Sequence, residues 1–258
     1  MTRGLYLSTA GMKAQEQRLD ALANNLANVN TPGYHRDVPG TRSFHWMLSE
    51  ATAPAQPVPT PATAGTATAT AATPLLPMEQ LPVPMVQTDR AEGQVSKTGR
   101  DLDLALSGDA FFVVAGKSGF RFTQAGNFTV SPDGYLATTS GELVQGDAGP
   151  IQMKGTQFQV SEDGVVAVDG KRVDKLRLVA LAPGSATKVG SAQFASTTPQ
   201  AAPASAKVKQ GFLQLSNVNA IQEMATLMTA TRAYETGQKL LQVQDQTLDR
   251  AVNEVGRV

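Results

Sequence analysis

Apolar residues recur in alternating steps of three and four along the first thirty residues of the chain. Six of the eight positions in this series are apolar, which is the heptad pattern of a helix that packs lengthwise on a partner helix. The apolar members of this N-terminal seam are Leu5, Met12, Leu19, Leu22, Leu26 and Val29. The tripeptide Thr31-Pro32-Gly33 follows. Proline disfavours helical geometry in the residue before it and glycine permits a turn, so we expect the helix to end here.

A second heptad series occupies the C-terminal end of the chain. Seven of its ten positions are apolar, and Thr231, Gln238 and Asp245 are the polar ones. The apolar members of this C-terminal seam are Met224, Leu227, Tyr234, Leu241, Leu248, Val252 and Val255. Asn219, with Gln222 three residues later, has the capping-box pattern of a helix N-terminus.

Two interpretations fit these seams. Each helix could be an ordinary amphipathic helix packed on the core of its own domain, or the two stripes could find partners in other copies of the chain. The seams lie at the two ends of the chain, nearly 190 residues apart, which favours assembly with copies of itself. Because polar residues interrupt the C-terminal seam, we expect the helices to become fully ordered only against neighbouring copies.

Residues 51–88 have a low-complexity composition. They contain eight of the fifteen prolines, many alanines and threonines, and one charged residue, Glu79. Such a segment buries too little apolar surface to form a core, and its prolines favour extended chain. It predicts a semi-rigid linker, an extended strap along a neighbour, or a segment that is disordered in the free monomer.

From about residue 86 to residue 212 the pattern is typical of short β-strands. The apolar run 111–114 indicates a buried strand. Segments 128–136 and 158–166 resemble each other, and each has an Asp-Gly turn signal between two strand patterns. Two similar hairpins indicate a compact domain of antiparallel strands.

These patterns predict an α+β protein. Its N- and C-terminal helices are expected to form a coiled-coil-like stalk, and its centre an antiparallel all-β domain. The expected divisions are an N-terminal helix at 1–34, an extended Pro/Ala/Thr-rich connector at 35–90, a β-rich domain at 91–212 and a C-terminal helix at 213–258.

The composition argues against several classes of partner. The chain has 22 basic and 22 acidic residues, so it has no basic surface for nucleic acid. It contains no run of 18 apolar residues, which argues against a membrane span. Lys13, Gln15 and Glu16 interrupt the early apolar stretch, so a cleaved secretory signal is not expected. Cysteine is absent, which excludes disulfides.

Residue types suited to phosphate or metal binding do not form a recognisable site. Gly116-Lys117-Ser118 resembles the end of a phosphate-binding loop. It lacks the loop's earlier glycine and precedes a strand pattern, so it is interpreted as a hairpin turn. His35 and His45 have no acidic partner at ligand spacing, which argues against zinc.

The carboxylates give no better catalytic candidate. Asp133 and Asp163 each precede a turn glycine, so turn formation explains them better than paired-carboxylate catalysis. Asp101 and Asp103 are expected on the solvent side of an alternating strand. We therefore expect no enzyme activity, catalytic residue, cofactor, metal or small-molecule substrate.

Both ends of the chain resemble the bacterial flagellar basal-body rod protein family, the axial proteins of the rod and hook. Residues 24–36, NNLANVNTPGYHR, are similar to the family's N-terminal signature, and 216–245, which begin SNVN, to its C-terminal signature. Segments 106–112 and 122–128 look like strands of the family's β-domain. The signature positions are Asn24, Asn25, Asn28, Thr31, Gly33, Tyr34, Ser216, Asn217, Asn219, Arg232, Tyr234 and Glu235. The length and the modest β-domain are similar to the FlgF/FlgG type.

The resemblance implies a structural subunit that assembles with itself and with other rod and hook axial proteins into a helical tube. The terminal helices would line the tube, which would transmit torque from motor to hook and let exported subunits pass. It also implies an extracytoplasmic place in the basal body, reached through the flagellar (type III) export apparatus without a cleaved signal peptide. Three alternatives are a hook-type axial protein of the same family, a flagellum-associated cell-wall hydrolase and a surface adhesin on a helical stalk.

Overall fold

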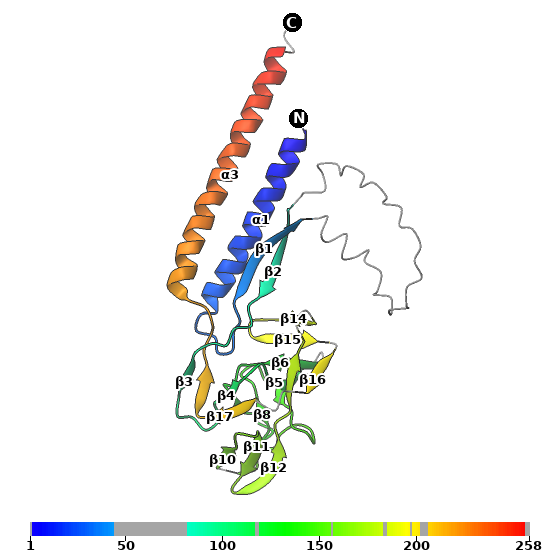
Figure 1. Cartoon of the computed structure of the whole chain (residues 1–258), viewed down its shortest axis with the longest axis vertical. Helices are drawn as coiled ribbons and strands as arrows, with labels where there is room; N and C mark the ends of the chain where they lie inside the picture. Colours follow the sequence, from blue (N-terminus) through cyan, green and yellow to red (C-terminus); the bar gives the residue numbers. More distant parts are fainter. Residues whose placement is uncertain are drawn as a thin grey trace, which may run out of the picture. The chain divides into compact units, whose positions relative to one another are not determined.

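The structure, a computed structural model, describes residues 2–43, 82–116, 119–155, 157–182, 185–196, 198–201 and 206–255. As far as it is described, the chain divides into two units (Figure 1). The helical unit consists of Met1–Ala23, Val38–Gln87 and Ala225–Val258, and the β unit of Asn24–Asp37 and Thr88–Met224. The predicted mixture of two terminal helices and a β-rich centre is thus confirmed.

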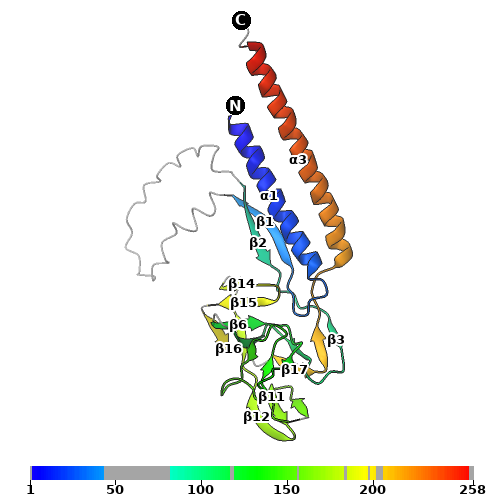
Figure 2. The same ribbon diagram turned by 180° about the vertical axis from the view of Figure 1, so that it is seen from behind.

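The two helices are α1 at Thr2–Ala27 and α3 at Ala220–Val255. In the helical unit they lie side by side in both views (Figures 1 and 2). The helix α1 ends before Thr31-Pro32-Gly33, because residues 28–30 already form a turn. The helix α3 begins directly after Asn219, whose Oδ1 accepts hydrogen bonds from the backbone N–H groups of Ile221 and Gln222 at 3.1 and 3.3 Å. The predicted N-cap at Asn219 is confirmed.

The expected connector begins and ends in paired strands. β1 (Asp37–Ser43) and β2 (Pro82–Thr88) form a two-stranded ribbon. Residues 44–81, which include His45 and most of the low-complexity segment, lie outside the described residues. No helix in the described part of the chain is long and apolar enough to cross a membrane.

The β unit is built from short strands that pair antiparallel. Their bounds are β3 Val95–Lys97, β4 Leu104–Ser107, β5 Phe111–Gly116, β6 Gly119–Thr123, β7 Thr129–Val130, β8 Leu136–Ala137, β9 Leu143–Val144, β10 Phe158–Val160, β11 Val165–Val168, β12 Lys171–Lys175, β13 Leu178–Leu181, β14 Ala186–Lys188, β15 Gln193–Ser196, β16 Pro199–Ala201, β17 Lys207–Gln210 and β18 Phe212–Gln214. The main sheet has the order β14-β15-β6-β5-β9-β8-β7, and β13 joins β5 to β16. Smaller sheets are β10-β11-β12, β17-β4 and β18-β3.

The two predicted hairpins are confirmed. β7 pairs with β8 and β10 with β11, and each pair is joined by a tight turn. The turn glycines, Gly134 and Gly164, have φ angles of 77° and 78°, which residues other than glycine rarely adopt. Asp133 and Asp163 precede these glycines in the turns. β5 and β6 pair up to Gly116 and Gly119. Lys117 and Ser118, for which a hairpin turn is predicted, lie outside the described residues.

The central strand β5 separates two hydrophobic clusters. Phe112 and Val114 belong to the larger cluster, and Phe111 and Val113 to the smaller. The alternation follows because successive side chains of a strand point to opposite faces. The predicted buried run 111–114 is therefore confirmed.

The solvent-side assignment of Asp103 is wrong. Asp103 is buried, its backbone oxygen accepts a hydrogen bond from Gly211 N–H at 2.8 Å, and its carboxylate lies 3.8 Å from Arg100. Leu104, Ala105 and Leu106 of β4 are all buried, so this strand is covered on both of its faces. Burial therefore does not alternate here, and the two-residue pattern did not identify a solvent side for Asp103.

Candidate functional site: the asparagine-rich junction

Three segments that are distant in the sequence meet in the β unit. They are residues 33–37, which lie between α1 and β1, residues 89–91, which follow β2, and residues 214–217, which precede α3. We call this meeting point the junction. Backbone bonds already link its segments, because Gly33 N–H donates to Gln214 O at 2.9 Å and Asp89 N–H donates to Arg36 O at 2.8 Å.

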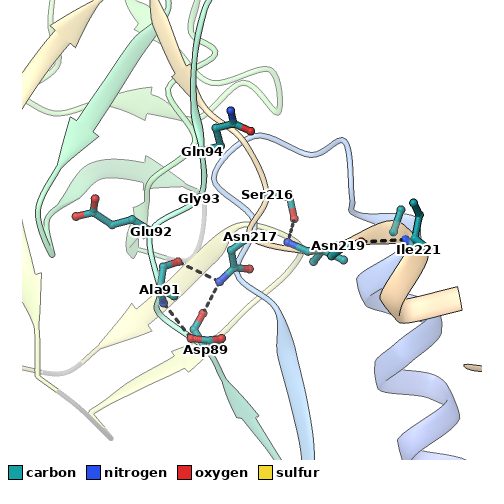
Figure 3. Close-up of a pocket in the computed structure, with 11 residues that line it drawn as sticks. Asp89, Ala91, Glu92, Gly93, Gln94, Ser216, Asn217, Asn219 and Ile221 are labelled. Atoms are coloured by element: carbon teal, nitrogen blue, oxygen red, sulfur yellow. Dashed lines mark hydrogen bonds between the residues drawn. The ribbon is translucent and has the colours of Figure 1, made fainter. Parts of the chain in front are cut away.

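Asn217 binds all three segments together. Its Oδ1 accepts a hydrogen bond from Arg36 N–H at 2.7 Å. Its Nδ2 donates to the backbone oxygens of Asp89 and Ala91 at 3.1 and 3.0 Å (Figure 3). A side-chain amide can donate from its nitrogen and accept at its oxygen at the same time. Asn217 therefore holds the entrance to α3 against the exits from α1 and β2.

Asn25 has the corresponding role at the end of α1. It is fully buried. Its Nδ2 donates to Asp37 O at 2.8 Å, and its Oδ1 accepts from Asp37 N–H at 2.8 Å and from the Tyr34 hydroxyl at 3.0 Å. These bonds explain why an asparagine lies inside the helix, where its propensity is poor.

Gly33 lets the chain after α1 lie directly on the β unit. Its φ is 65°, in the left-handed region that favours glycine. A β-carbon at this position would lie 2.2 Å from the backbone nitrogen of Ala125. No other residue fits without moving one of the two backbones.

A partly buried lysine from β14 stabilises the same segment. Lys188 Nζ donates to His35 O at 2.8 Å and lies 2.9 Å from Asp37 Oδ2. The ammonium also lies 3.8 Å from the centre of the Tyr34 ring, a cation–π arrangement. Burial lowers the pKa of Lys188, although the Asp37 carboxylate opposes this shift. Burial and the nearby Asp37 raise the pKa of Tyr34 well above its usual range, so the phenol remains a hydrogen-bond donor.

A second charge pair lies at the start of α3. Arg36 Nε lies 2.5 Å from Glu223 Oε1, as an ion pair without the alignment of a hydrogen bond. Glu223 is buried, whereas Arg36 is partly exposed. A buried carboxylate in the first turn also benefits from the helix dipole. The pair therefore ties the turn after α1 to the first turn of α3.

His35 is buried against Phe111 and Phe194. Its Nδ1 lies 3.3 Å from Asp89 O and its Nε2 3.0 Å from Gln124 Oε1. Burial lowers the pKa of His35. Among the described residues, no group of three potential metal ligands lies close together.

An open groove of about 620 Å³ runs between residues 89–94 and 216–221 (Figure 3). Gly93 brings the two segments together, because a β-carbon there would lie 1.8 Å from Leu215 O. The carboxylate of Asp89 accepts from Ala91 N–H and that of Glu92 from Gly108 N–H. The acidic groups of the groove thus bind backbone of the chain itself.

The remaining signature residues form hydrogen bonds only to residues close to them in the sequence, or are partly or fully exposed. Asn28 donates to Asn24 O and Oδ1, and Thr31 donates to Asn28 Oδ1. The Ser216 hydroxyl accepts from Val218 N–H. Tyr234 is partly buried, and Arg232 and Glu235 are exposed.

The predicted seam residues differ in burial. Leu22 is buried, whereas 47% of Met224 is exposed. The partly buried members are Met12, Leu19, Leu26, Val29, Leu227, Tyr234 and Leu241. The side chains of Leu5, Leu248, Val252 and Val255 lie outside the described residues.

On α3 the helices touch at positions that the predicted register did not include, whereas Met12 and Gln15 of α1 belong to the predicted N-terminal series. Gln15 Nε2 donates to Ala230 O at 3.1 Å, and Met12 Cγ would lie 3.6 Å from a β-carbon at Gly237. The polar seam positions Thr231, Gln238 and Asp245 are exposed instead. Leu227, Tyr234 and Leu241 fit either register, because they are seven residues apart.

Sequence reasoning missed Asp37, Gln124 and Lys188 as members of the junction. Lys188 lies 151 residues after Asp37 in the sequence, and it belongs to a strand pattern without any local signal of burial. Asp37 could have been suspected only from its position two residues after the signature histidine.

The sequence is similar to known proteins along its whole length. Residues 5–35 match a family model described as flagella basal body rod protein, and residues 209–254 match the flagellar basal body rod FlgEFG protein C-terminal model. Residues 105–168 match the flagellar hook protein FlgE/F/G D1 domain. The flagellar basal-body rod protein FlgF of Caulobacter vibrioides is 30% identical over 265 residues, which cover 100% of both chains.

The chain belongs to the flagellar basal-body rod protein family. The rod protein FlgF of Rhizobium meliloti is likewise 30% identical over 268 residues, covering 99% of both chains. FlgG of Bacillus subtilis is 28% identical over 271 residues, covering 98% of this chain and 99% of its own. The two terminal matches of the rod family contain most of α1, most of α3 and the junction residues Asn25 and Asn217. As a rod-family protein the chain is a structural component of the flagellum.

Proposed function

We propose that the chain polymerises through its terminal helices, with copies of itself and with other rod and hook axial proteins, into a helical tube. The observation that carries this proposal is the exposure of large apolar side chains on α3, although α3 already packs on α1. The exposed fractions are 82% for Ile221, 47% for Met224, 64% for Met228, 62% for Leu240 and 58% for Val243. Exposed apolar groups of this kind favour interaction with another protein surface.

The two seams also favour assembly with neighbouring copies. Most of their described members, such as Leu19 and Leu241, are only partly buried in the single chain. Complete burial of a leucine contributes roughly 1.5–3 kcal/mol relative to full exposure, so neighbouring copies can still gain free energy by covering these residues. The helices would therefore become fully ordered on assembly.

In this proposal the tube is part of the basal body, outside the cytoplasm. It transmits torque from motor to hook and lets exported subunits pass. The chain reaches this place through the flagellar export apparatus without a cleaved signal peptide. Family membership and the rod proteins to which the chain is similar support this placement.

A hook-type axial role is the second candidate within the family, because residues 105–168 match a domain described for hook and rod proteins together. The rod descriptions of both terminal matches favour the rod.

We further propose that the chain is not an enzyme. Asp133 and Asp163, the carboxylates weighed for a cell-wall hydrolase, lie in hairpin turns. A muralytic assay of Asp133→Asn and Asp163→Asn against the unchanged chain tests this: an activity that either substitution removes would contradict it.

Assembly is tested by Leu241→Asp, which places a charge in the seam. We expect concentrated Leu241→Asp protein to form no rods in negative-stain images, and cells that carry it not to swim. The matched control is Gln242→Asp, since Gln242 is the next residue and is exposed. Hydrogen exchange at β5 should be unchanged in both variants, which shows that the β unit remains folded. If Leu241→Asp protein still forms rods, or if cells that carry it still swim, Leu241 does not belong to the surface through which copies assemble.

A further inference from the structure

His35 lies between two oxygen atoms that both accept hydrogen bonds. Its Nε2 is 3.0 Å from Gln124 Oε1, and its Nδ1 is 3.3 Å from the backbone oxygen of Asp89. A neutral imidazole carries one N–H, so it can donate to only one of the two oxygens, whereas the imidazolium can donate to both. One nitrogen of the neutral ring therefore faces an oxygen without a proton between them.

The backbone around Gln124 determines which end of its amide faces the ring. Its Nε2 donates to the backbone oxygen of Ala110 at 3.1 Å, and its Oε1 accepts from Gln214 Nε2 at 2.9 Å. A rotated amide would turn its oxygen towards the Ala110 oxygen, which cannot donate. Gln124 is buried, and a buried polar group needs its hydrogen-bond partner. Gln124 therefore presents an acceptor to His35.

The proton of neutral His35 is expected on Nε2. The contact from Nε2 to Gln124 is the shorter of the two and has the length of an ordinary hydrogen bond. At the other nitrogen, the longer distance separates the Nδ1 lone pair from the Asp89 oxygen. This oxygen still accepts from Asn217 Nδ2 at 3.1 Å. Nδ1 is thus the place where a second proton would bind.

A second proton would make His35 a cation in unfavourable surroundings. Phe111 of β5 and Phe194 of β15 pack against the ring. Lys188 Nζ donates to His35 O at 2.8 Å, and the guanidinium of Arg90 is a second cation close by. Burial lowers the pKa of the ring most and the two cations lower it further, which together outweigh the effect of its hydrogen bonds.

Acidic side chains near the ring already have partners. The pairs are Asp37 with Lys188, Asp89 with the Ala91 N–H, and Glu223 with Arg36. The Tyr34 phenol stays neutral, because burial and the Asp37 carboxylate raise its pKa. In the described part of the chain, no carboxylate forms an ion pair with His35. The imidazolium would therefore be more stable in water than in the junction.

We propose that His35 is a pH-sensitive switch: a proton on Nδ1 detaches residues 33–37 and 89–91 from β5 and β15, while the rest of the β unit stays folded. Detachment lets water surround the imidazolium. The strand β5 keeps its other face, whose side chains belong to the larger hydrophobic cluster. Local opening of this kind needs less free energy than unfolding of the complete unit. The switch is a property of the single chain and does not depend on assembly.

The position of the proton is tested by nuclear magnetic resonance of isotope-labelled histidine at neutral pH, with His35→Gln to assign the signals. The unchanged chain should show His35 with its proton on Nε2. Gln124→Met keeps the approximate size of the side chain but removes the acceptor at Nε2, so the proton should move to Nδ1 and bond to Asp89 O. A proton on Nδ1 in the unchanged chain, or on Nε2 in folded Gln124→Met, would overturn the assignment. If Gln124→Met does not fold, the unchanged chain alone decides.

The detachment is tested by hydrogen exchange of single amides, corrected for the intrinsic pH dependence of exchange. The amides of Gly33 and Asp89, which bond to Gln214 O and Arg36 O, report on the junction, and the amides of β5 report on the sheet. The opened chain titrates near the ordinary pKa of about 6.5, so at pH ~5.5 about ten opened chains are protonated for each neutral one. Between pH ~7.5 and pH ~5.5 the protection of both junction amides should fall severalfold, to at most about tenfold, while that of β5 stays unchanged.

His35→Gln is the matched variant, because glutamine can still donate to Gln124 but does not titrate. Its protection should be the same at both pH values after the correction, even if it is lower throughout. A similar pH-dependent loss in His35→Gln would assign the effect to another group, and an equal loss at β5 would show that the whole unit opens. No pH-dependent loss in the unchanged chain would show that the junction does not exclude the proton. Each of these three results would overturn the switch.

Discussion

Asn25 and Asp37 are joined by two hydrogen bonds of 2.8 Å, one from Asn25 Nδ2 to Asp37 O and one from Asp37 N–H to Asn25 Oδ1. The side-chain amide thus bonds both backbone groups of the first residue of β1, as a neighbouring strand would. The chain between the last turn of α1 and the ribbon is thereby closed into a short loop. The position of the loop is fixed by Gly33 and Lys188, which hold it on the β unit.

Asn25→Ala should destabilise the β unit. It leaves the backbone N–H and C=O of Asp37 and the Tyr34 hydroxyl without their partner, in a site that is fully buried. We expect a loss of about 2–4 kcal/mol in the free energy of unfolding. The urea midpoint, followed by tyrosine fluorescence, measures it. Asn24→Ala is the control, because Asn24 is exposed and should cost less than about 1 kcal/mol; equal losses would contradict the role of Asn25.

Gly33→Ala should push residues 33–37 of the junction away from Ala125. The added β-carbon needs an unfavourable φ and collides with the backbone of Ala125, so we expect a cost of about 2–5 kcal/mol. Gly99→Ala distinguishes the two causes, because Gly99 has a similar φ of 74° but open space around it. Gly99→Ala should cost only about 1 kcal/mol. If both variants lose the same stability in thermal unfolding, close approach at Gly33 is not the reason for its glycine.

Local sequence patterns were sufficient to predict most of the turns, strands and helix ends. The Asp-Gly turns, the buried run 111–114 and the Asn219 cap depend on residues a few positions apart, and the structure confirms them. Asp103 was misjudged because the segment around β4 is buried on both faces, so the alternating pattern did not identify a solvent side. Local patterns therefore failed where burial depends on the rest of the fold.

The junction could be predicted only in part. The signature identified Asn25 and Asn217, yet their partners are backbone groups whose positions depend on the complete fold. Lys188 carries no signal, since an isolated lysine in a short strand is usually solvated. The helix register was ambiguous for a related reason: small residues such as Ala230 and Gly237 carry no hydropathy signal, although they allow close approach.

Gly237→Ala should stabilise the helical unit. A β-carbon there would lie 3.6 Å from Met12 Cγ, an ordinary van der Waals contact, and alanine is about 1 kcal/mol more favourable than glycine inside a helix. Gly237→Leu should instead push α1 away from α3. Far-ultraviolet circular dichroism during heating measures both effects.

Gly11 provides the control for this contact, because it lies in α1 with open space around it. Gly11→Ala and Gly11→Leu should both stabilise the helices. A leucine that is tolerated equally well at positions 11 and 237 would show that the two helices do not approach at Gly237.

His35 should make the stability of the β unit depend on pH. Burial lowers its pKa in the folded chain below the ordinary value of about 6.5, and the nearby Lys188 and Arg90 cations act in the same direction, while hydrogen bonds to Asp89 and Gln124 oppose it. As the pH falls below about 6.5, the unfolded chain takes up the proton first. The stability that the neutral His35 contributes is present above that pH and is lost as the pH falls through the lower folded pKa.

His35→Gln removes this titration while keeping a side chain that can form hydrogen bonds. Urea midpoints measured from neutral to mildly acidic pH should therefore fall more steeply for the unchanged chain than for His35→Gln. Carboxylates titrate in both proteins, so the difference between the curves isolates His35. If the curve of His35→Gln is parallel to that of the unchanged chain, then His35 is not held neutral by the junction.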